Sequence, residues 1–170
     1  MSHNVDVRRD RPDGPRAPPT LGGVLVIEQE LVNAIVAHAK KDHPDEACGV
    51  VTGPEGSDRP TRFVPMLNAA MSPTFYEFDS ADLLALYQEM DAQVEVPVVV
   101  YHSHTATQAY PSRTDIGLAM EPDAHYLLVS TREHGNAPGD VELRSYRIRD
   151  GEVAEEPVRV VASYDGDPPE

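Results

Sequence analysis

The stretch YHSHTATQAYPSRTD, residues 101–115, places two histidines, a serine and an aspartate where a strand, a loop and a helix follow one another. His102 and His104 stand two apart at the end of a β-branched run, so they share one face of the predicted strand. The PSRTD end predicts a helix whose first turn holds Asp115 and directs it back at the imidazoles. Two imidazoles and a carboxylate make three zinc ligands and leave one position for water. The stretch therefore predicts a catalytic metal centre.

Another carboxylate, Glu46, meets the second requirement of metal-assisted hydrolysis. That reaction needs a side chain that does not bind the metal but takes a proton from water and passes it to the leaving amine. Glu46 directly precedes Cys48–Thr52, an apolar run that predicts a strand. An acidic residue in this setting is also commonly a solvated loop charge, and the residues alone leave both interpretations open.

Structural alternatives exist for the other residues as well. Ser112 and Asp115 match a helix capping box, in which they would only satisfy backbone donors at a helix start. The two roles are compatible, because Ser112 can cap the helix while its hydroxyl faces the metal. His102 and His104 could be partly buried histidines at a sheet rim. The whole pattern favours the metal site.

Glu46, the pair His102-x-His104 and the pair Ser112-x-x-Asp115 together resemble the signature of the JAMM (MPN+) metallopeptidases. This family of zinc isopeptidases includes deubiquitinases and bacterial relatives. Cupin-type sites need a glutamate soon after the histidine pair, zincins need H-E-x-x-H, and zinc deaminases need paired cysteines. The sequence has none of these.

The resemblance extends over residues 23–162 and is greatest to the actinobacterial Mec-type subfamily. Residues 101–115 carry it together with EPDAHYLLVSTR, residues 121–132, and ELRSYRI, residues 142–148. Many family members have proline after the second histidine, and Thr105 here is a feature that the Mec-type sequences share. These peptidases release cysteine from a ubiquitin-like sulfur-carrier protein.

The resemblance implies a single α/β domain of the MPN, cytidine-deaminase-like architecture, with a mixed β-sheet flanked by helices. It implies one Zn²⁺ held by His102, His104 and Asp115, with Glu46 moving the proton and Ser112 donating to the oxyanion. The implied substrate is the Gly-Gly tail of a ubiquitin-like sulfur carrier joined by an amide to cysteine, so that hydrolysis releases L-cysteine for cysteine biosynthesis.

Four points stay open. The enzyme could act on another ubiquitin-like tail, or the domain could be an MPN scaffold that binds such partners without cleaving them. Arg113 opposes the helix macrodipole, so it is either a contact for the carboxylate of the terminal cysteine or a solvated arginine. A homodimer is also left open.

Length and charge restrict the class of protein. A chain of 170 residues predicts one domain, and a net charge of −15 with a pI near 4.7 argues against nucleic-acid partners. The single cysteine, Cys48, is predicted to be a small buried residue and fits a reducing cytoplasm. The N-terminus has proline, aspartate and arginine where a signal peptide would need an apolar core, and the apolar runs are too short for a membrane span, so we expect a cytoplasmic protein.

The sequence predicts a disordered tail at 1–22, the metallopeptidase domain implied by the resemblance at 23–162 and an acidic tail at 163–170. Strands are expected at residues 23–27, 48–52, 62–67, 96–104, 125–131, 141–149 and 153–161. Helices are expected at residues 28–41, from 79 or 80 onward, and at 112–120. The remaining histidines have no partner at ligand spacing and are predicted to be structural or solvated: His3, His38, His43, His125 and His134.

Overall fold

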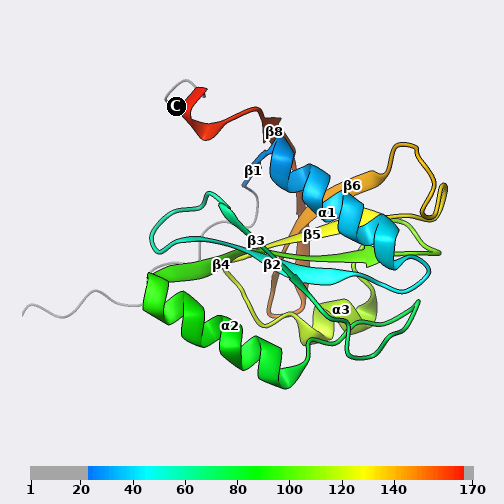
Figure 1. The fold of residues 1–170 in the computed structure, drawn as a ribbon, viewed down its shortest axis with the longest axis horizontal. Coiled ribbons are helices and arrows are strands. Elements are labelled where there is room, and N and C mark those ends of the chain that lie inside the picture. Colours follow the sequence, from blue (N-terminus) through cyan, green and yellow to red (C-terminus); the bar gives the residue numbers. More distant parts are fainter. Residues whose placement is uncertain (1–22, 167–170) are drawn as a thin grey trace, which may run out of the picture.

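The computed structural model describes residues 23–166, so the tail predicted at 1–22 and the last residues, 167–170, lie outside the described residues. Figure 1 shows the elements, which run β1 Leu25–Glu28, α1 Gln29–Asp42, β2 Cys48–Pro54, β3 Arg62–Met66, α2 Ser80–Gln93, β4 Glu95–His104, α3 Arg113–Leu118, β5 His125–Ser130, β6 Glu142–Arg149, β7 Glu152–Glu156, β8 Val158–Val161 and the 3-10 helix Tyr164–Gly166. None of the helices in this part of the chain is long and apolar enough to cross a membrane.

A six-stranded sheet carries the strands in the order β3-β2-β4-β5-β6-β7. β4 and β5 are parallel and the other neighbours are antiparallel, which confirms the predicted mixed sheet. The histidine-bearing strand, β4, lies in the interior of this sheet and is buried from Val98 to His104. A second sheet pairs β1 with β8 in parallel.

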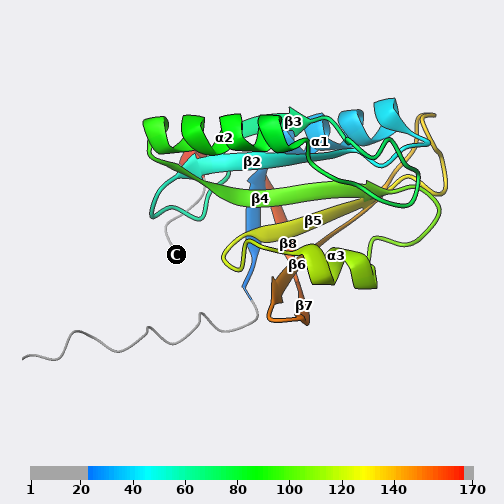
Figure 2. The ribbon, with the colours of Figure 1, turned by 90° about the horizontal axis from the view of Figure 1, so that it is seen from below.

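Side chains of β4 alternate between two cores. Val99 and Tyr101 pack with Ile35 of α1 on one face, whereas Val100 belongs to a cluster on the other face, against which Ile116 of α3 packs. α2 also packs on this second face. Figure 1 shows α1 on one side of the strands and α2 and α3 on the other, and Figure 2 shows β2, β4 and β5 side by side. The two histidines of β4 continue the face of Val100, which is the face that α3 covers.

The structure corrects two predicted elements. The strand expected at 153–161 is wrong as one element, because it divides at Pro157 into β7, which pairs with β6, and β8, which pairs with β1. Proline has no backbone N–H to continue a ladder. The helix expected at 112–120 is shorter, since Ser112 is its N-cap and Ala119 its C-cap.

The 3-10 helix contacts the body of the domain. The hydroxyl of Tyr164 donates to the carbonyl of Pro60 at 2.5 Å, and the guanidinium of Arg59 lies 5.0 Å from the centre of the Tyr164 ring. Ordered contacts therefore continue past the end of β8, and the division at residue 163 stays a prediction.

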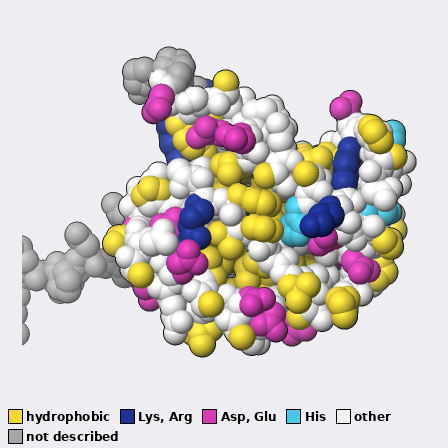
Figure 3. Space-filling view, in the orientation of Figure 1, with side chains coloured by type: hydrophobic (Ala, Val, Ile, Leu, Met, Phe, Trp, Pro, Cys, Tyr) yellow, Lys and Arg dark blue, Asp and Glu magenta, His cyan; other side chains and the backbone are white. Residues whose placement is uncertain are grey.

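One edge of the large sheet is open. β3 has a strand neighbour on one side only, among the described residues. Apolar side chains gather between α1 and α2, where β3 lies (Figure 3). Phe63 and Val64 of β3 are partly buried there, and Leu67, directly after the strand, is 62% exposed. An open strand edge can add a further strand from an extended peptide.

Candidate metal centre

Strand β4 sets the position of both histidines. His102 and His104 are 1% and 5% exposed, and their neighbours on the flanking strands fix the backbone on either side. Ser103, between them, points to the opposite face, where its hydroxyl accepts a hydrogen bond from the Ala47 N–H at 2.8 Å. The same residue therefore ties the start of β2 to the end of β4.

Three candidate ligand atoms meet at one point. Oδ2 of Asp115 lies 3.1 Å from Nε2 of His102 and 3.1 Å from Nε2 of His104, and the two nitrogens are 3.2 Å apart. Two ligands about 2.0–2.1 Å from a tetrahedral zinc ion are about 3.4 Å apart. The triangle thus has close to the size of one face of such a tetrahedron. These residues fit a zinc ion that keeps a fourth position open.

Helix α3 supplies Asp115 through a capping box. Ser112 Oγ accepts from the Asp115 N–H at 3.1 Å, and Asp115 Oδ2 accepts from the Ser112 N–H at 2.8 Å. The capping box is confirmed, and it is compatible with a metal site because Asp115 Oδ2 belongs to both the capping box and the cluster of candidate ligand atoms. The Ser112 hydroxyl accepts in this motif and keeps its own proton as a donor.

Asp115 is held in its ionised form. Burial acts to raise its pKa, but the hydrogen bonds with His102 and His104 outweigh burial and hold the pKa well below its usual range. Burial, in turn, lowers the pKa of His102. A carboxylate beside a neutral imidazole is the state in which both groups can bind a metal.

Each histidine is oriented in a different way. Nδ1 of His104 donates to the carbonyl of Gln108 at 2.9 Å, and a neutral ring held in this way would bind a metal ion through Nε2. Nδ1 of His102 is buried without a hydrogen-bond partner in the described chain. Its ring instead lies against the ring of Tyr76, with centroids 4.5 Å apart. Gln108 and Tyr76 were not predicted from the sequence, because neither stands at a spacing that is typical of a metal site.

Glu46 is buried, at 4% exposure, so its interpretation as a solvated loop charge is wrong. Burial raises the pKa of its carboxyl to about 7, against a lowering effect of His104. Its backbone N–H donates to the carbonyl of Ser72, and its carbonyl accepts from the amide of Asn68. A carboxyl with a pKa near 7 can both accept and return a proton near neutral pH.

The remaining predictions for histidine and cysteine can be checked within the described residues. Three of the histidines predicted to be structural or solvated make side-chain hydrogen bonds: His38 with Tyr101, His43 with Thr131, and His125 with Glu156. These bonds agree with structural roles. His134 is exposed, and His3 lies outside the described residues. Cys48 is buried, which confirms the prediction of a small buried residue, and burial raises its pKa to about 12.

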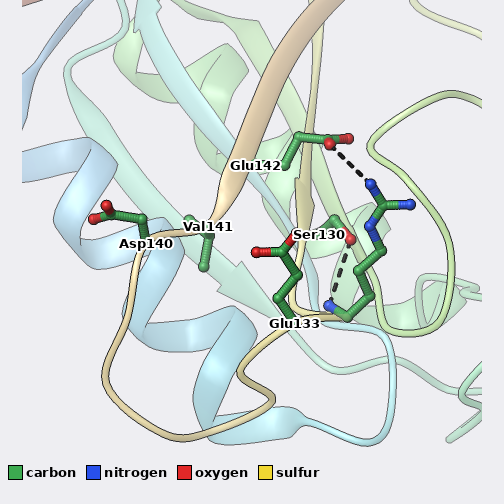
Figure 4. Close-up of a pocket in the computed structure, with 6 residues that line it drawn as sticks. Ser130, Glu133, Asp140, Val141 and Glu142 are labelled. Carbon is green, nitrogen blue, oxygen red and sulfur yellow. Dashed lines mark hydrogen bonds and ion pairs between the residues drawn. The ribbon is translucent and has the colours of Figure 1, made fainter.

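Two cavities have a lining residue next to a histidine of the candidate site: Tyr76 stacks on His102, and Ser130 pairs with His104. The larger, of about 400 Å³, has a mainly apolar lining that includes Tyr76, Phe78, Leu86 and Tyr126. The smaller, of about 200 Å³, is lined by acidic side chains and Arg132, and Figure 4 shows Glu142 paired with an arginine there. Through Tyr76 the larger cavity adjoins His102.

Comparison with known proteins agrees with this geometry. Residues 28–149 match a family model described as prokaryotic homologues of the JAB domain. The CysO-cysteine peptidase of Mycobacterium tuberculosis is 66% identical over 141 residues, which cover 83% of this chain and 94% of that protein. The desampylase of Haloferax volcanii is 31% identical over 111 residues, covering 62% of this chain and 80% of that protein.

A solved structure has the same fold. The solution structure of protein DSY2949 from Desulfitobacterium hafniense superposes with a TM-score of 0.70 at 29% identity, and the match covers 83% of this chain and 94% of that one. Similarity thus spans nearly all of the described domain.

Proposed function

The chain belongs to the family of prokaryotic JAB-domain homologues, and from this premise we propose that it is a zinc-dependent amide hydrolase. Its substrate is a ubiquitin-like sulfur-carrier protein whose C-terminal Gly-Gly is joined to cysteine, and its product is L-cysteine. The observation that carries the proposal is the convergence of two imidazoles and a carboxylate beside a buried glutamate with a pKa near 7.

His102, His104 and Asp115 are the residues that would hold the ion. Bound there, zinc supplies Lewis acidity, which polarises the scissile carbonyl and lets water attack near neutral pH. Glu46 accepts the proton that the attacking water loses and delivers it to the nitrogen of the departing cysteine. Ser112 donates a hydrogen bond from its hydroxyl to the carbonyl oxygen as that oxygen gains charge.

Two observations support the proposed substrate: the similarity to the mycobacterial peptidase and the open edge of β3. The mycobacterial peptidase shares 66% of its aligned residues with this chain. An extended tail can pair with the open edge of β3, and glycines carry no side chains that would obstruct such pairing. The similarity to a desampylase favours, as second candidate, cleavage of another ubiquitin-like tail. An inactive scaffold is disfavoured, because the full set of ligands and the buried base are present.

Arg113 is proposed to bind the carboxylate of the terminal cysteine. It is exposed and directly follows Ser112 at the start of α3. We expect Arg113→Gln to raise KM for a carrier ending in cysteine while KM for the same carrier ending in cysteine amide stays unchanged. Equal effects on both substrates would contradict this role.

The two candidate substrates can be separated directly. The zinc-loaded protein is incubated with a sulfur carrier extended by one C-terminal cysteine and, in parallel, with the same carrier linked through Gly-Gly to a lysine side chain. We predict faster cleavage of the cysteine adduct. Preferential cleavage of the lysine linkage would assign the enzyme to the second candidate.

A further inference from the structure

The metal centre contains an asymmetry between its two histidines. A metal-binding histidine ordinarily donates its second ring N–H to an acceptor, which fixes the plane of the ring. His104 has such an acceptor in the carbonyl of Gln108. His102 is 1% exposed, and its Nδ1 has no hydrogen-bond partner within residues 23–166. Something else must hold the plane of the His102 ring.

An aromatic ring takes this place. The rings of Tyr76 and His102 are stacked, with centroids 4.5 Å apart and an interplanar angle of 26°. Phe78 in turn packs edge-on against Tyr76, with ring centroids 5.6 Å apart. Rotation of the imidazole out of its plane would break the stack with Tyr76. Aromatic stacking therefore restrains the same angle that a hydrogen bond would restrain.

Tyr76 is itself held in place by a buried amide. The side chain of Asn68 is 4% exposed and donates to the carbonyls of Glu46 and Phe75, at 3.0 and 2.9 Å. Its oxygen accepts from the N–H of Glu77 at 3.1 Å. These bonds grip the backbone on both sides of Tyr76 and join it to the backbone of the proposed base.

We propose that Tyr76 is a positioning residue for the metal centre, which by stacking on His102 keeps Nε2 of that imidazole directed at the ion. The inference rests on the proposed metal site, but it assigns to Tyr76 a role that the ligand pattern does not contain. Tyr76 touches the ligand and not the ion. Substitution of Tyr76 should therefore lower the affinity for zinc directly, and any effect on turnover should follow from the weaker zinc binding.

Zinc affinity measured by competition with a chromophoric chelator tests the role. Loss of a group that orients a ligand typically weakens metal binding by about 10- to 100-fold, and we expect this for Tyr76→Leu. Tyr76→Phe keeps the ring and should bind zinc within about twofold of the wild type. The cobalt-substituted protein gives a second reading, because the Leu variant should change the visible spectrum of the bound ion while the Phe variant should not.

Control variants separate positioning from general damage. Tyr87→Leu removes another ring from the same cavity without touching a ligand, and it should leave zinc affinity unchanged. Circular dichroism of each zinc-free variant establishes that it is folded, and Tyr76→Met, which fills the space without a ring, replaces the Leu variant if that one unfolds.

The outcomes are distinct. A folded Leu or Met variant with wild-type affinity would overturn the inference, as would an equal loss in the Phe variant, since the hydroxyl rather than the ring would then be responsible. If the wild type itself bound no zinc, the proposed function would fall as well. Normal binding by the wild type with a selective loss in the ringless variant supports Tyr76 alone.

Discussion

Two carboxyl groups in the metal centre are tuned in opposite directions by their surroundings. Burial raises the pKa of Glu46 to about 7, whereas hydrogen bonds with two imidazoles hold the pKa of Asp115 far below its usual range. One carboxyl can therefore exchange a proton near neutral pH while the other stays ionised. Such a separation fits the acid-base role proposed for Glu46 and the ligand role proposed for Asp115.

Glu46→Gln should lower kcat by about 10²- to 10⁴-fold, the usual contribution of a general acid-base group. Zinc binding should be kept, because Glu46 is not among the three converging ligand atoms. Since the base must be ionised, activity of the wild type should fall as pH decreases below its pKa, and a pH-rate profile measures this. Asp45→Asn changes the neighbouring carboxyl and serves as the control. Wild-type turnover in Glu46→Gln would remove Glu46 from the mechanism.

Ser112→Ala removes a helix cap and the proposed oxyanion donor. We expect kcat to fall by about 10²- to 10³-fold and the free energy of unfolding to fall by about 1 kcal/mol. Ser112→Thr keeps a hydroxyl and should restore most of both. Steady-state kinetics and urea unfolding measure the two effects. If the Ala variant lost stability but no activity, Ser112 would be a cap only.

Three residues of the candidate site could be predicted because their positions depend only on nearby sequence. The alternation of β4 put His102 and His104 on one face, and the capping signature put Asp115 at the start of α3. Tyr76 and Asn68 were not predictable in this way. Their positions depend on how the segment between β3 and α2 folds back over β4, and no spacing in the sequence encodes that contact.

At the scale of elements, a buried polar cluster joins β5, β6 and β7. Nδ1 of His125 hydrogen-bonds to Glu156, which also accepts from Ser145 Oγ at 2.8 Å. Asp58 lies 2.9 Å from Nε2 of His125, and Arg147 lies 3.3 Å from Glu156. The sequence placed His125 at the start of a strand, but it gave no sign of this pairing, because the partners come from three other segments.

This cluster makes stability depend on pH. Burial acts to lower the pKa of His125, but hydrogen bonds with Asp58 and Glu156 outweigh burial and raise this pKa above 6.5. Burial acts to raise the pKa of Glu156, but its hydrogen bond with His125 outweighs burial and lowers the pKa of Glu156 below 4.5. A raised histidine pKa stabilises fully below 6.5, and that stabilisation is lost as pH rises through the folded-state pKa. A lowered glutamate pKa stabilises above 4.5, and that stabilisation is lost as pH falls through its folded-state pKa.

His125→Gln should therefore lower the free energy of unfolding by about 3 kcal/mol or more near pH 5.5, because it leaves Glu156 without its imidazolium partner. Urea unfolding at pH 5.5 and pH 9 should give a smaller difference from the wild type at the higher pH. His134→Gln alters an exposed histidine and should change stability by less than about 0.5 kcal/mol. A difference independent of pH would contradict a charged pair.

Across the whole molecule, the mixed sheet and its helices could be foreseen, but the connection between its ends could not. The strand expected at 153–161 divides so that β8 joins β1, which brings segments from the two ends of the described chain together. Such pairing over long separations follows from packing of the whole domain, and Pro157 was its only local sign.

Zinc should stabilise the whole domain, because the ligands come together only in the folded chain. At a free zinc concentration 100 times Kd, the free energy of unfolding should rise by about 2.7 kcal/mol. Thermal unfolding with zinc and with chelator measures the shift. His104→Ala should lose the shift and His134→Gln should keep it. No shift in the wild type would argue against a metal ion held by these residues.

The proposed activity is the hydrolysis of a single amide bond, between the C-terminal glycine of the carrier and cysteine. The zinc-loaded protein is incubated in H₂¹⁸O with a ubiquitin-like sulfur carrier extended by one C-terminal cysteine, and the intact mass is followed beside a chelated sample and a Glu46→Gln sample. We predict loss of one cysteine residue and gain of one ¹⁸O in the new glycine carboxylate, in the zinc-loaded wild type only. An unchanged carrier mass with zinc bound, or cleavage that persists in the Glu46→Gln sample, would contradict the account.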